Sequence, residues 1–247
     1  MIDCHSHIIP TIDDGASSIE EAITMLGLAY VDGVRTQVLT PHVHPERYDN
    51  SCASLRIYFA AFKDIAERAG IKLKLRIAGE FRISPQLMEV VQQDDMLWLG
   101  EWDGKKAFLL ELPHSNVPMG SINIIKWLVQ QNIVPIIVHP ERNREMQKKP
   151  DLLKEFIYQG CLVQLTAGSL LGQFGHAATQ YAGRLLKEGV VSFLATDCHN
   201  VNYRPPNLSE GVNKAAEIIG RHAAIELVTR FPQKLISNKQ SGLKLIA

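Results

Sequence analysis

Residues 133–139 read IVPIIVH: five aliphatic residues and a proline, closed by one histidine. A short apolar run of this kind is typical of a buried strand. Six further runs share its aliphatic or β-branched character, and most of them end at or just before a histidine or an acidic residue. The seven predicted strands lie around Ile2 and at 34–40, 73–78, 107–112, 133–138, 161–165 and 190–195.

Longer stretches with the periodicity of amphipathic helices separate these strands. Helices are expected at 18–32, after Ser17 as N-cap, and at 51–69, 85–91, 119–131, 151–159, 177–188, 208–220 and 222–230. Strict alternation of strand and helix predicts parallel strands joined by right-handed crossovers, either in an open doubly wound sheet or closed into a barrel. No internal repeat or obvious linker interrupts the chain, so one domain over residues 1–247 is expected.

Composition excludes several classes of protein. Hydrophobic residues make up 46% of the 247 residues and charged residues 21%, which is enough apolar surface for a sizeable core. The 26 basic residues balance 26 acidic ones, so nonspecific binding to nucleic acid is not expected. No segment resembles a secretory signal or reaches the roughly 20 apolar residues of a membrane span, and the four cysteines are scattered. A cytoplasmic protein with reduced thiols and no membrane insertion is expected.

Side chains that bind metals follow the strands at their carboxyl ends. In a parallel α/β barrel these ends meet on one face, where active sites are assembled from several strands. Two pairs stand two residues apart, a spacing that aims both side chains of a strand the same way. The strand-end residues are His5, His7, His42, Glu80, Glu111, His139, Asp197 and His199.

The loop TIDDG adds Asp13 or Asp14 as a further carboxylate, and we choose Asp14. Nine imidazole and carboxylate donors exceed the four to six ligands of one ion, so two or three divalent ions are expected. Donors of this type suit manganese, iron or zinc. The four other histidines, His44, His114, His176 and His222, are expected to bind no metal.

Residues 196–205, TDCHNVNYRP, allow a second interpretation. Cys198 and Arg204 stand at the C-x5-R spacing of phosphatases that use a thiolate nucleophile. A thiolate needs a loop whose N–H groups converge on phosphate, commonly with glycine present. This stretch has no glycine, continues into Pro205 and places the anionic Asp197 beside the thiol. We therefore expect Asp197 and His199 to bind metal, and the Cys198 side chain to point away as a spacer.

Seven motifs together resemble a known superfamily. They are IDCHSHIIPTIDDG, TPHVHPERY, AGEFRIS, LLELP, IVHPERNRE, QLTAGSLLGQFG and ATDCHNVNYRPP, and the resemblance as a whole runs from residue 1 to about 236. The chain resembles the polymerase and histidinol phosphatase (PHP) superfamily and, within it, the bacterial protein-tyrosine phosphatases of the CpsB/YwqE type from capsule and exopolysaccharide loci. Cys4 and Cys198 replace residues that are often aliphatic or Met in such proteins, and Tyr203 stands where some have glycine.

The resemblance implies a distorted seven-stranded (β/α)7 TIM-like barrel and a site of two to three divalent ions, most often manganese. Matched residue by residue, it assigns metal binding to the nine donors named above, Asp14 included. It assigns contacts with the substrate phosphate to Arg142 and Arg204, whereas Arg47 and Arg144 have no comparable support. The implied substrate is phosphotyrosine in a protein, the tyrosine-rich cytoplasmic tail of a bacterial autokinase.

The expected chemistry is direct attack on phosphorus by a metal-bridging hydroxide, with no phosphocysteine. Two arginines would hold the remaining phosphate oxygens through planar, bidentate hydrogen bonds. Two alternatives stay open: a phosphoesterase for a small substrate such as histidinol phosphate or for a nucleic-acid phosphodiester, and a metal-binding partner protein without catalytic activity. The sequence leaves the oligomeric state open.

Overall fold

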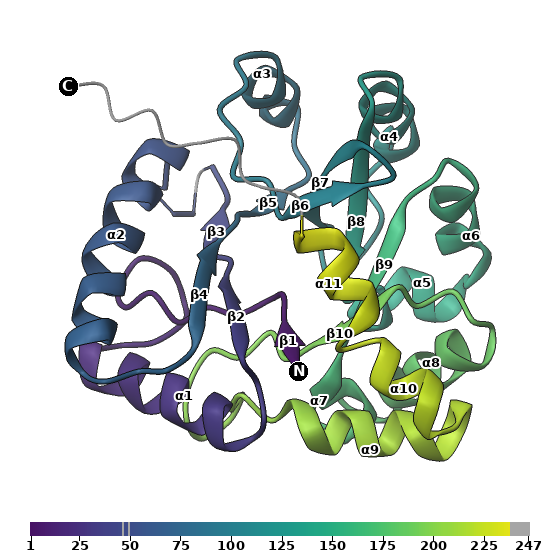
Figure 1. Cartoon of the computed structure of the whole chain (residues 1–247). Helices are drawn as coiled ribbons and strands as arrows, with labels where there is room; N and C mark the ends of the chain where they lie inside the picture. Colours follow the sequence, from purple (N-terminus) through teal and green to yellow (C-terminus); the bar gives the residue numbers. More distant parts are fainter. Residues whose placement is uncertain (46, 49, 238–247) are drawn as a thin grey trace.

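Strands and helices alternate along most of the chain in the computed structural model, which describes residues 1–45, 47–48 and 50–237 (Figure 1). The domain expected over residues 1–247 extends to residues 238–247, which lie outside the described residues. Residue 46, in the motif TPHVHPERY, also lies outside the described residues. The strands are β1 (Ile2–Asp3), β2 (Thr36–Leu39), β3 (His42–Val43), β4 (Lys74–Ile77), β5 (Glu80–Arg82), β6 (Gly100–Trp102), β7 (Lys105–Glu111), β8 (Ile133–Val138), β9 (Leu162–Thr166) and β10 (Phe193–Ala195).

The strands form two hydrogen-bonded sheets, ordered β1-β2-β4 and β10-β9-β8-β7-β5-β3, with β6 beside β7. All pairings are parallel except that of β6 with β7. The fold is thus a mixed α/β fold with mostly parallel strands. The residues just beyond β1 and β10 also approach each other: the N–H of His7 donates to the carbonyl of Cys198 at 2.9 Å, and the N–H of Asp197 donates to that of His5 at 2.9 Å.

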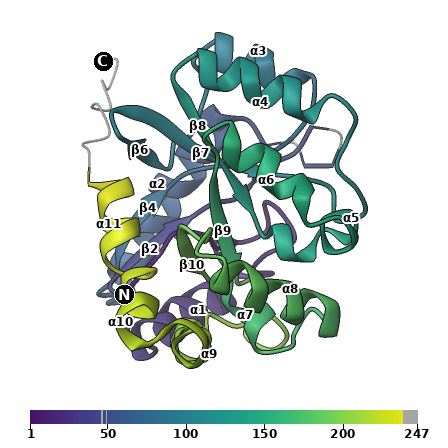
Figure 2. The ribbon, with the colours of Figure 1, turned by 90° about the vertical axis from the view of Figure 1, so that its right-hand side faces the viewer.

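Helices lie around the outside of the strands, as Figures 1 and 2 show from two sides. They are α1 (Ile19–Val31), α2 (Cys52–Arg68), α3 (Gln86–Gln92), α4 (Ser121–Gln130), α5 (Arg144–Lys148), α6 (Asp151–Tyr158), α7 (Ala167–Leu170), α8 (His176–Lys187), α9 (Leu208–Ile219), α10 (Arg221–Glu226) and α11 (Arg230–Ile236), with a 3-10 turn, η1 (Pro140–Arg142). Within the described residues, no helix combines the length and apolarity needed to cross a membrane.

Successive residues of a strand enter two different hydrophobic clusters. In β7, Ala107 and Leu109 belong to a cluster that includes Leu235 and Ile236 of α11, whereas Phe108 packs in the cluster that also includes buried residues of the outer helices. This alternation is the two-residue period of a strand that is buried on both faces. It explains why these strands appear in the sequence as continuous apolar runs.

Most predicted strands and helices are confirmed, and the differences concern short elements and bounds. The strand β5 and the helices α5, α7 and α11 were not predicted, and the helix expected at 222–230 ends at Glu226 as α10. The run 34–40 is followed by a second short strand, β3, because Thr40 and Pro41 interrupt the pairing after β2. The N-cap of α1 is Ser18, whose side chain accepts from the N–H of Glu21, and not Ser17. The strand β6 was missed, although Asp103 and Gly104, with φ of 49° and 78°, form the turn that an Asp-Gly pair predicts for a hairpin.

A buried carboxylate ties three strands together below the site. Asp3 in β1 accepts hydrogen bonds from the N–H and hydroxyl of Thr196, at 3.0 and 2.5 Å, and from the side-chain amide of Gln37 at 2.9 Å. Burial raises the pKa of Asp3, whereas these bonds lower it. Because Asp3 and both partners are buried, losing the carboxylate would leave donors without acceptors.

We therefore predict that Asp3→Ala lowers the free energy of unfolding by about 2 to 3 kcal/mol, the typical result of stranding buried donors. Urea denaturation of the metal-free protein measures this change. Glu67→Ala is the control, because the Glu67 side chain forms an exposed ion pair with Lys63 at 3.6 Å, and its loss should cost at most about 0.5 kcal/mol. Equal effects of the two substitutions would contradict the prediction.

Candidate metal centre

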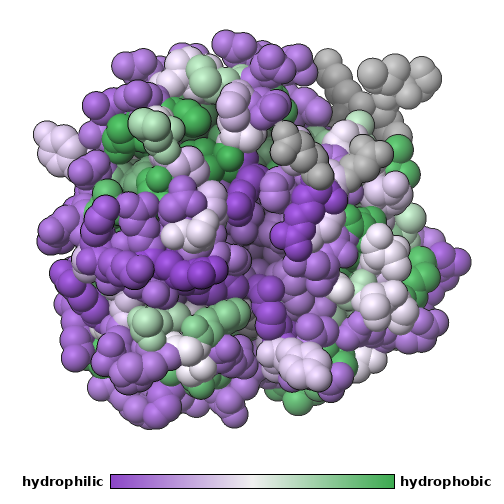
Figure 3. All heavy atoms as spheres, turned by 180° about the vertical axis from the view of Figure 1, so that it is seen from behind, coloured by the Kyte–Doolittle hydropathy of each residue, from purple (hydrophilic) through white to green (hydrophobic). Residues whose placement is uncertain are grey.

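The nine predicted donors lie together where the parallel strands end. The strands run away from the side that holds the N-terminus and α11 (Figure 2), so their carboxyl ends open on the face shown in Figure 3, where hydrophilic residues surround a hollow. Each of the nine belongs to at least one group of side chains whose ligand atoms lie within 4.8 Å of one another. The fold thus brings together residues that lie more than 190 positions apart in the sequence, such as His5 and His199.

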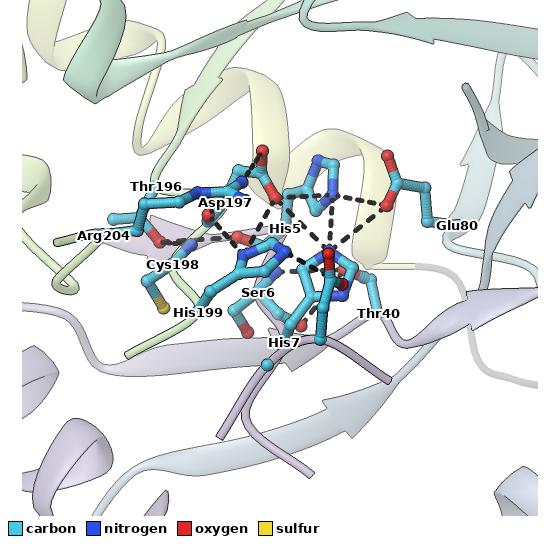
Figure 4. Close-up of polar contacts among 12 residues, drawn as sticks. His5, Ser6, His7, Thr40, Glu80, Thr196, Asp197, Cys198, His199 and Arg204 are labelled. Carbon is cyan, nitrogen blue, oxygen red and sulfur yellow. Dashed lines mark hydrogen bonds and ion pairs between the residues drawn. The ribbon is translucent and has the colours of Figure 1, made fainter. Parts of the chain in front are cut away.

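Glu80, at the start of β5, contacts several imidazoles of the cluster, and Figure 4 shows its contacts with His5 and His7. Its Oε2 atom is 3.3 Å from His5 Nε2, 3.2 Å from His7 Nε2 and 2.9 Å from His42 Nδ1. Its Oε1 atom is 2.9 Å from His139 Nε2. One carboxylate therefore faces four imidazoles: two that follow β1, one in β3 and one that follows β8.

Asp197 connects this cluster to the two arginines. Its Oδ1 atom is 3.3 Å from Nε2 of both His5 and His7, and these two nitrogens are themselves 3.3 Å apart. Its Oδ2 atom accepts from Arg142 Nη2 at 2.6 Å and from Arg204 Nη2 at 2.5 Å. One oxygen of this buried carboxylate thus faces imidazole nitrogens that could bind a metal ion. The other faces guanidinium groups that could bind phosphate.

The neighbours Asp13 and Asp14 occupy different positions. Asp13 Oδ2 lies 2.8 Å from His7 Nδ1 and accepts the backbone N–H of His42 at 3.1 Å. Asp14 Oδ1 instead lies 3.3 Å from His42 Nε2 and 3.4 Å from His199 Nε2. Asp13 therefore orients an imidazole from behind, while Asp14 faces the nitrogens that could share an ion with it.

Gly15 allows the loop that bears these two aspartates to pack on the backbone of His7. A Cβ at Gly15 would lie 2.1 Å from the carbonyl oxygen of His7 and 2.6 Å from its Cβ, so no other residue fits. The N–H of Gly15 also donates to Asp13 Oδ1 at 3.0 Å. This close approach places Asp13 within reach of the His7 ring.

Further hydrogen bonds fix the imidazole orientations. His5 Nδ1 lies 3.0 Å from Gln164 Oε1 in β9, and His199 Nδ1 lies 3.0 Å from the carbonyl of Asp197. A ring nitrogen that faces an oxygen of this kind carries the proton, which leaves the lone pair of the other nitrogen directed at the site. Both rings therefore present Nε2 toward the cluster.

Two buried strand-end residues have an unusual backbone conformation. His139 has φ of 38° and ψ of 48°, and Asp197 has φ of 52°. Left-handed conformations cost non-glycine residues roughly 1 to 3 kcal/mol and concentrate at functional sites. In both places the strained residue is one of the nine predicted donors, which indicates that its side-chain direction matters more than local stability.

The shared atoms of the cluster fit divalent cations. Glu80 Oε2, His42 Nδ1 and Asp197 Oδ1 are buried but make no hydrogen bond among the described residues, although nitrogens or oxygens lie nearby. Buried polar atoms without partners are rare and call for an ion or water. With neutral imidazoles, the carboxylates Asp13, Asp14, Glu80, Glu111 and Asp197 also outnumber the arginines that pair with them at low exposure, Arg82, Arg142 and Arg204. The residual negative charge suits metal ions.

The pKa shifts reflect the same crowding. Burial alone would raise the pKa of Glu80, but His5 and His42 hold it well below its usual range. Burial would likewise raise the pKa of Asp197, which Arg204 and His5 hold well below its usual range. Burial and the charge of His7 lower the pKa of His199 to about 4. Glu80 and Asp197 are therefore charged and His199 is neutral, the protonation states that metal ligation requires of these three. Burial lowers the pKa values of His7 and His42, but Asp13 raises that of His7 well above its usual range and Glu80 raises that of His42 to about 9, so a metal ion would have to displace protons from these two rings.

Two residues near the site were not singled out from the sequence. Arg82 Nη1 lies 3.0 Å from Glu111 Oε2, and its position two residues after Glu80 on β5 is the same spacing that pairs His5 with His7. His114 was expected to bind no metal, yet its ring nitrogens form a possible ligand group with Glu111 and His139. Its spacing in LELPH offered no comparable signal, because a loop residue has no fixed direction.

The cysteine of TDCHNVNYRP lies outside the cluster. Cys198 is fully buried in the apolar cluster that includes the outer helices, and Figure 4 shows its sulfur directed away from His5, His7 and Asp197. Burial and the charge of Asp3 raise the pKa of its thiol. A buried thiol that stays protonated is not a nucleophile.

The site combines imidazoles and carboxylates, buried polar atoms without hydrogen-bond partners among the described residues, and two arginines bound to Asp197. This combination is typical of hydrolases that act on phosphate esters with divalent cations. The family model for capsular polysaccharide synthesis, CpsB/CapC, matches residues 1–237. The chain belongs to this family.

Similar proteins agree with that assignment. CapC of Staphylococcus aureus is 33% identical over 213 residues, which cover 86% of this chain and 82% of the relative. The tyrosine-protein phosphatase YwqE of Bacillus subtilis (strain 168) is 33% identical over 204 residues, covering 83% and 79%. A crystal structure from work on YwqE of Bacillus subtilis and CpsB of Streptococcus pneumoniae, described as metal-dependent tyrosine phosphatases, matches with a TM-score of 0.89 at 30% identity over 97% of this chain and 95% of that one.

We predict that manganese stabilises the metal-free protein, because bound cations offset the buried carboxylates. At 100 times the dissociation constant the gain should be about 2.7 kcal/mol. Thermal melts with manganese, and again after EDTA, measure it. Glu80→Gln should lose most of this gain, whereas Asp64→Asn, which alters an exposed pair with Arg68, should keep it. No shift with manganese, iron or zinc would contradict a metal site.

Proposed function

We propose that this protein hydrolyses phosphotyrosine in other proteins with the help of divalent cations. The observation that carries the proposal is Asp197, which joins the metal-type histidines to Arg142 and Arg204 through its two oxygens. Substrate phosphate bound to those arginines would lie beside the cations. The tyrosine phosphatases among the relatives, and the metal dependence described for the similar crystal structure, support the same activity.

The proposed metal ligands are His5, His7, Asp14, His42, Glu80, Glu111, His139, Asp197 and His199, and the proposed occupants are two to three ions, manganese first and iron or zinc as alternatives. When bound, such ions polarise the phosphate and yield a hydroxide nucleophile near neutral pH. The protein supplies the remaining functions. Asp13 and Gln164 hold the rings of His7 and His5 in orientation, and Cys198 takes no part.

Arg142 and Arg204 are the proposed phosphate contacts. Each commits Nη2 to Asp197, while the Nε atom of each is buried and has no hydrogen-bond partner among the described residues. A buried donor without a partner calls for an acceptor, which an oxygen of a bound phosphate would supply. The leaving tyrosyl oxygen has a conjugate-acid pKa of about 10, so a dedicated general acid is not required.

Three wider features belong to the same proposal. The two sheets would form the expected distorted (β/α)7 TIM-like barrel in a single domain, which the parallel bridge between Ser6 and Cys198 supports. The substrate would be the cytoplasmic, tyrosine-rich tail of a bacterial tyrosine kinase that controls capsular polysaccharide synthesis. This protein would then act in the cytoplasm. The family of capsular polysaccharide synthesis proteins supports the biological setting.

Comparison of a phosphotyrosyl peptide with histidinol phosphate tests the substrate. We expect kcat/KM to favour the peptide by about tenfold or more, the discrimination that a few substrate contacts provide. Manganese-reconstituted protein should be active and thoroughly chelated protein inactive. Activity that survives chelation would exclude the metal mechanism, and preference for histidinol phosphate would exclude the assignment to tyrosine.

Substitutions in residues 196–199 separate the metal mechanism from a cysteine mechanism. Cys198→Ser should retain activity within about threefold, because the sulfur lies away from the site. Asp197→Ala should lose about a hundred- to a thousandfold in kcat, as removal of a central electrostatic group does. Steady-state kinetics on the phosphotyrosyl peptide measures both. The reverse order of effects would restore the thiolate interpretation.

A further inference from the structure

The loop after β9 contributes none of the nine predicted metal ligands, yet it reaches the arginines. Phe174, between α7 and α8, is half-buried, and its ring lies under both guanidinium groups. Arg142 Cζ is 4.7 Å from the ring centroid and Arg204 Cζ is 5.6 Å from it. Both distances are within the range of a cation–π interaction.

Two guanidinium groups held so close together need compensation. Arg142 and Arg204 place their Nη2 atoms on the same oxygen of Asp197, at 2.6 and 2.5 Å. Their like charges repel at that spacing, and among the described residues they share one carboxylate oxygen, while Arg204 Nη2 also donates to the backbone carbonyl of Asp197 at 2.9 Å. The negative face of an aromatic ring offers attraction to both at once without forming a hydrogen bond that would occupy their donors.

The backbone around Phe174 is arranged for this approach. A Cβ at Gly168 would lie 2.0 Å from Gln173 Oε1, the end of a flexible side chain, and 3.3 Å from Phe174 Cε2, so the Phe174 ring packs closely on the backbone where the loop folds back. The neighbouring Glu141, directly before Arg142, accepts from the N–H of Thr166 at 3.1 Å and from the hydroxyl of Ser169 at 2.6 Å. The turn that bears Arg142 is thus fastened to the same loop that bears Phe174.

We infer that Phe174 is a positioning residue, which holds Arg142 and Arg204 side by side as a two-arginine clamp for the phosphate of the substrate. The ring and Asp197 fix the guanidinium planes, and a bound phosphate would supply an acceptor for the Nε atoms, which are buried without a partner among the described residues. The inference rests on the proposed function, because it assigns phosphate to this pair. It predicts that Phe174 affects binding of any phosphate, including inorganic phosphate without a tyrosyl ring.

Calorimetric titration of the manganese-loaded protein with inorganic phosphate tests the clamp without turnover. Phe174→Leu, which keeps an apolar side chain but removes the π face, should weaken phosphate binding about tenfold, and this corresponds to about 1.4 kcal/mol. Phe174→Tyr keeps the π face and should stay within about twofold of the original protein. Phe231→Leu is the matched control, because Phe231 is a half-buried aromatic residue stacked on Trp102 in another part of the molecule.

A double-mutant cycle shows whether Phe174 acts through the arginines. In an Arg204→Met background, Phe174→Leu should weaken phosphate binding only about threefold, because one of its two cation partners is already gone. An unchanged tenfold effect would overturn the inference, as would a loss of peptide affinity with no change for inorganic phosphate. Metal content and melting temperature show whether Phe174→Leu is folded. If it is not, Phe174→Met, also without a π face, must reproduce the tenfold loss or the inference fails.

Failure of the clamp is distinguishable from failure of the proposed function. If the original protein binds inorganic phosphate but does not hydrolyse the phosphotyrosyl peptide, the substrate assignment fails while the Phe174 comparison still decides the clamp. If the peptide is hydrolysed and Phe174→Leu binds phosphate as tightly as the Phe231→Leu control, the clamp alone is wrong.

Discussion

The burial of negative charge is the constraint on which the site depends. Glu80 and Asp197 are almost completely shielded from water, and the free energy required to desolvate a carboxylate is several kcal/mol unless positive charge compensates it. Imidazoles face Glu80, and arginines face one side of Asp197, but one oxygen of each still makes no hydrogen bond among the described residues. The strands, the aspartate loop and the strained backbone at His139 all place compensating groups around these two side chains.

The division of Asp197 between two kinds of partner also explains how a phosphate could be accepted there. A dianionic ligand would be repelled by a cluster of carboxylates alone. Arg142 and Arg204 face Asp197 with one nitrogen each and keep other donors free, so positive charge extends beyond the carboxylate toward the open face. The cations proposed on the other side of Asp197 would attract the same ligand.

The sequence predicted those features that follow from local periodicity. Apolar runs located most strands, and the ends of those strands located Glu80, His139 and their neighbours, because parallel strands must end on one side. It could not separate Asp13 from Asp14, since loop residues have no periodic direction and the different contacts of the two depend on the packing of Gly15 on His7. Phe174 was also beyond sequence reasoning, because a contact between a ring and two arginines depends on tertiary structure.

The cysteine and the metal interpretations of TDCHNVNYRP require neighbouring charges of opposite sign. A thiolate nucleophile is stabilised by converging N–H groups and cations, without carboxylates nearby. Here the neighbours of Cys198 include Asp197 and, across the strands, Asp3, and both raise the pKa of its thiol. The carboxylates that suit the site to divalent cations would destabilise a thiolate in the same place. The residues around Asp197 can therefore support phosphate hydrolysis through metal ions and arginine, while Cys198 packs in the hydrophobic core.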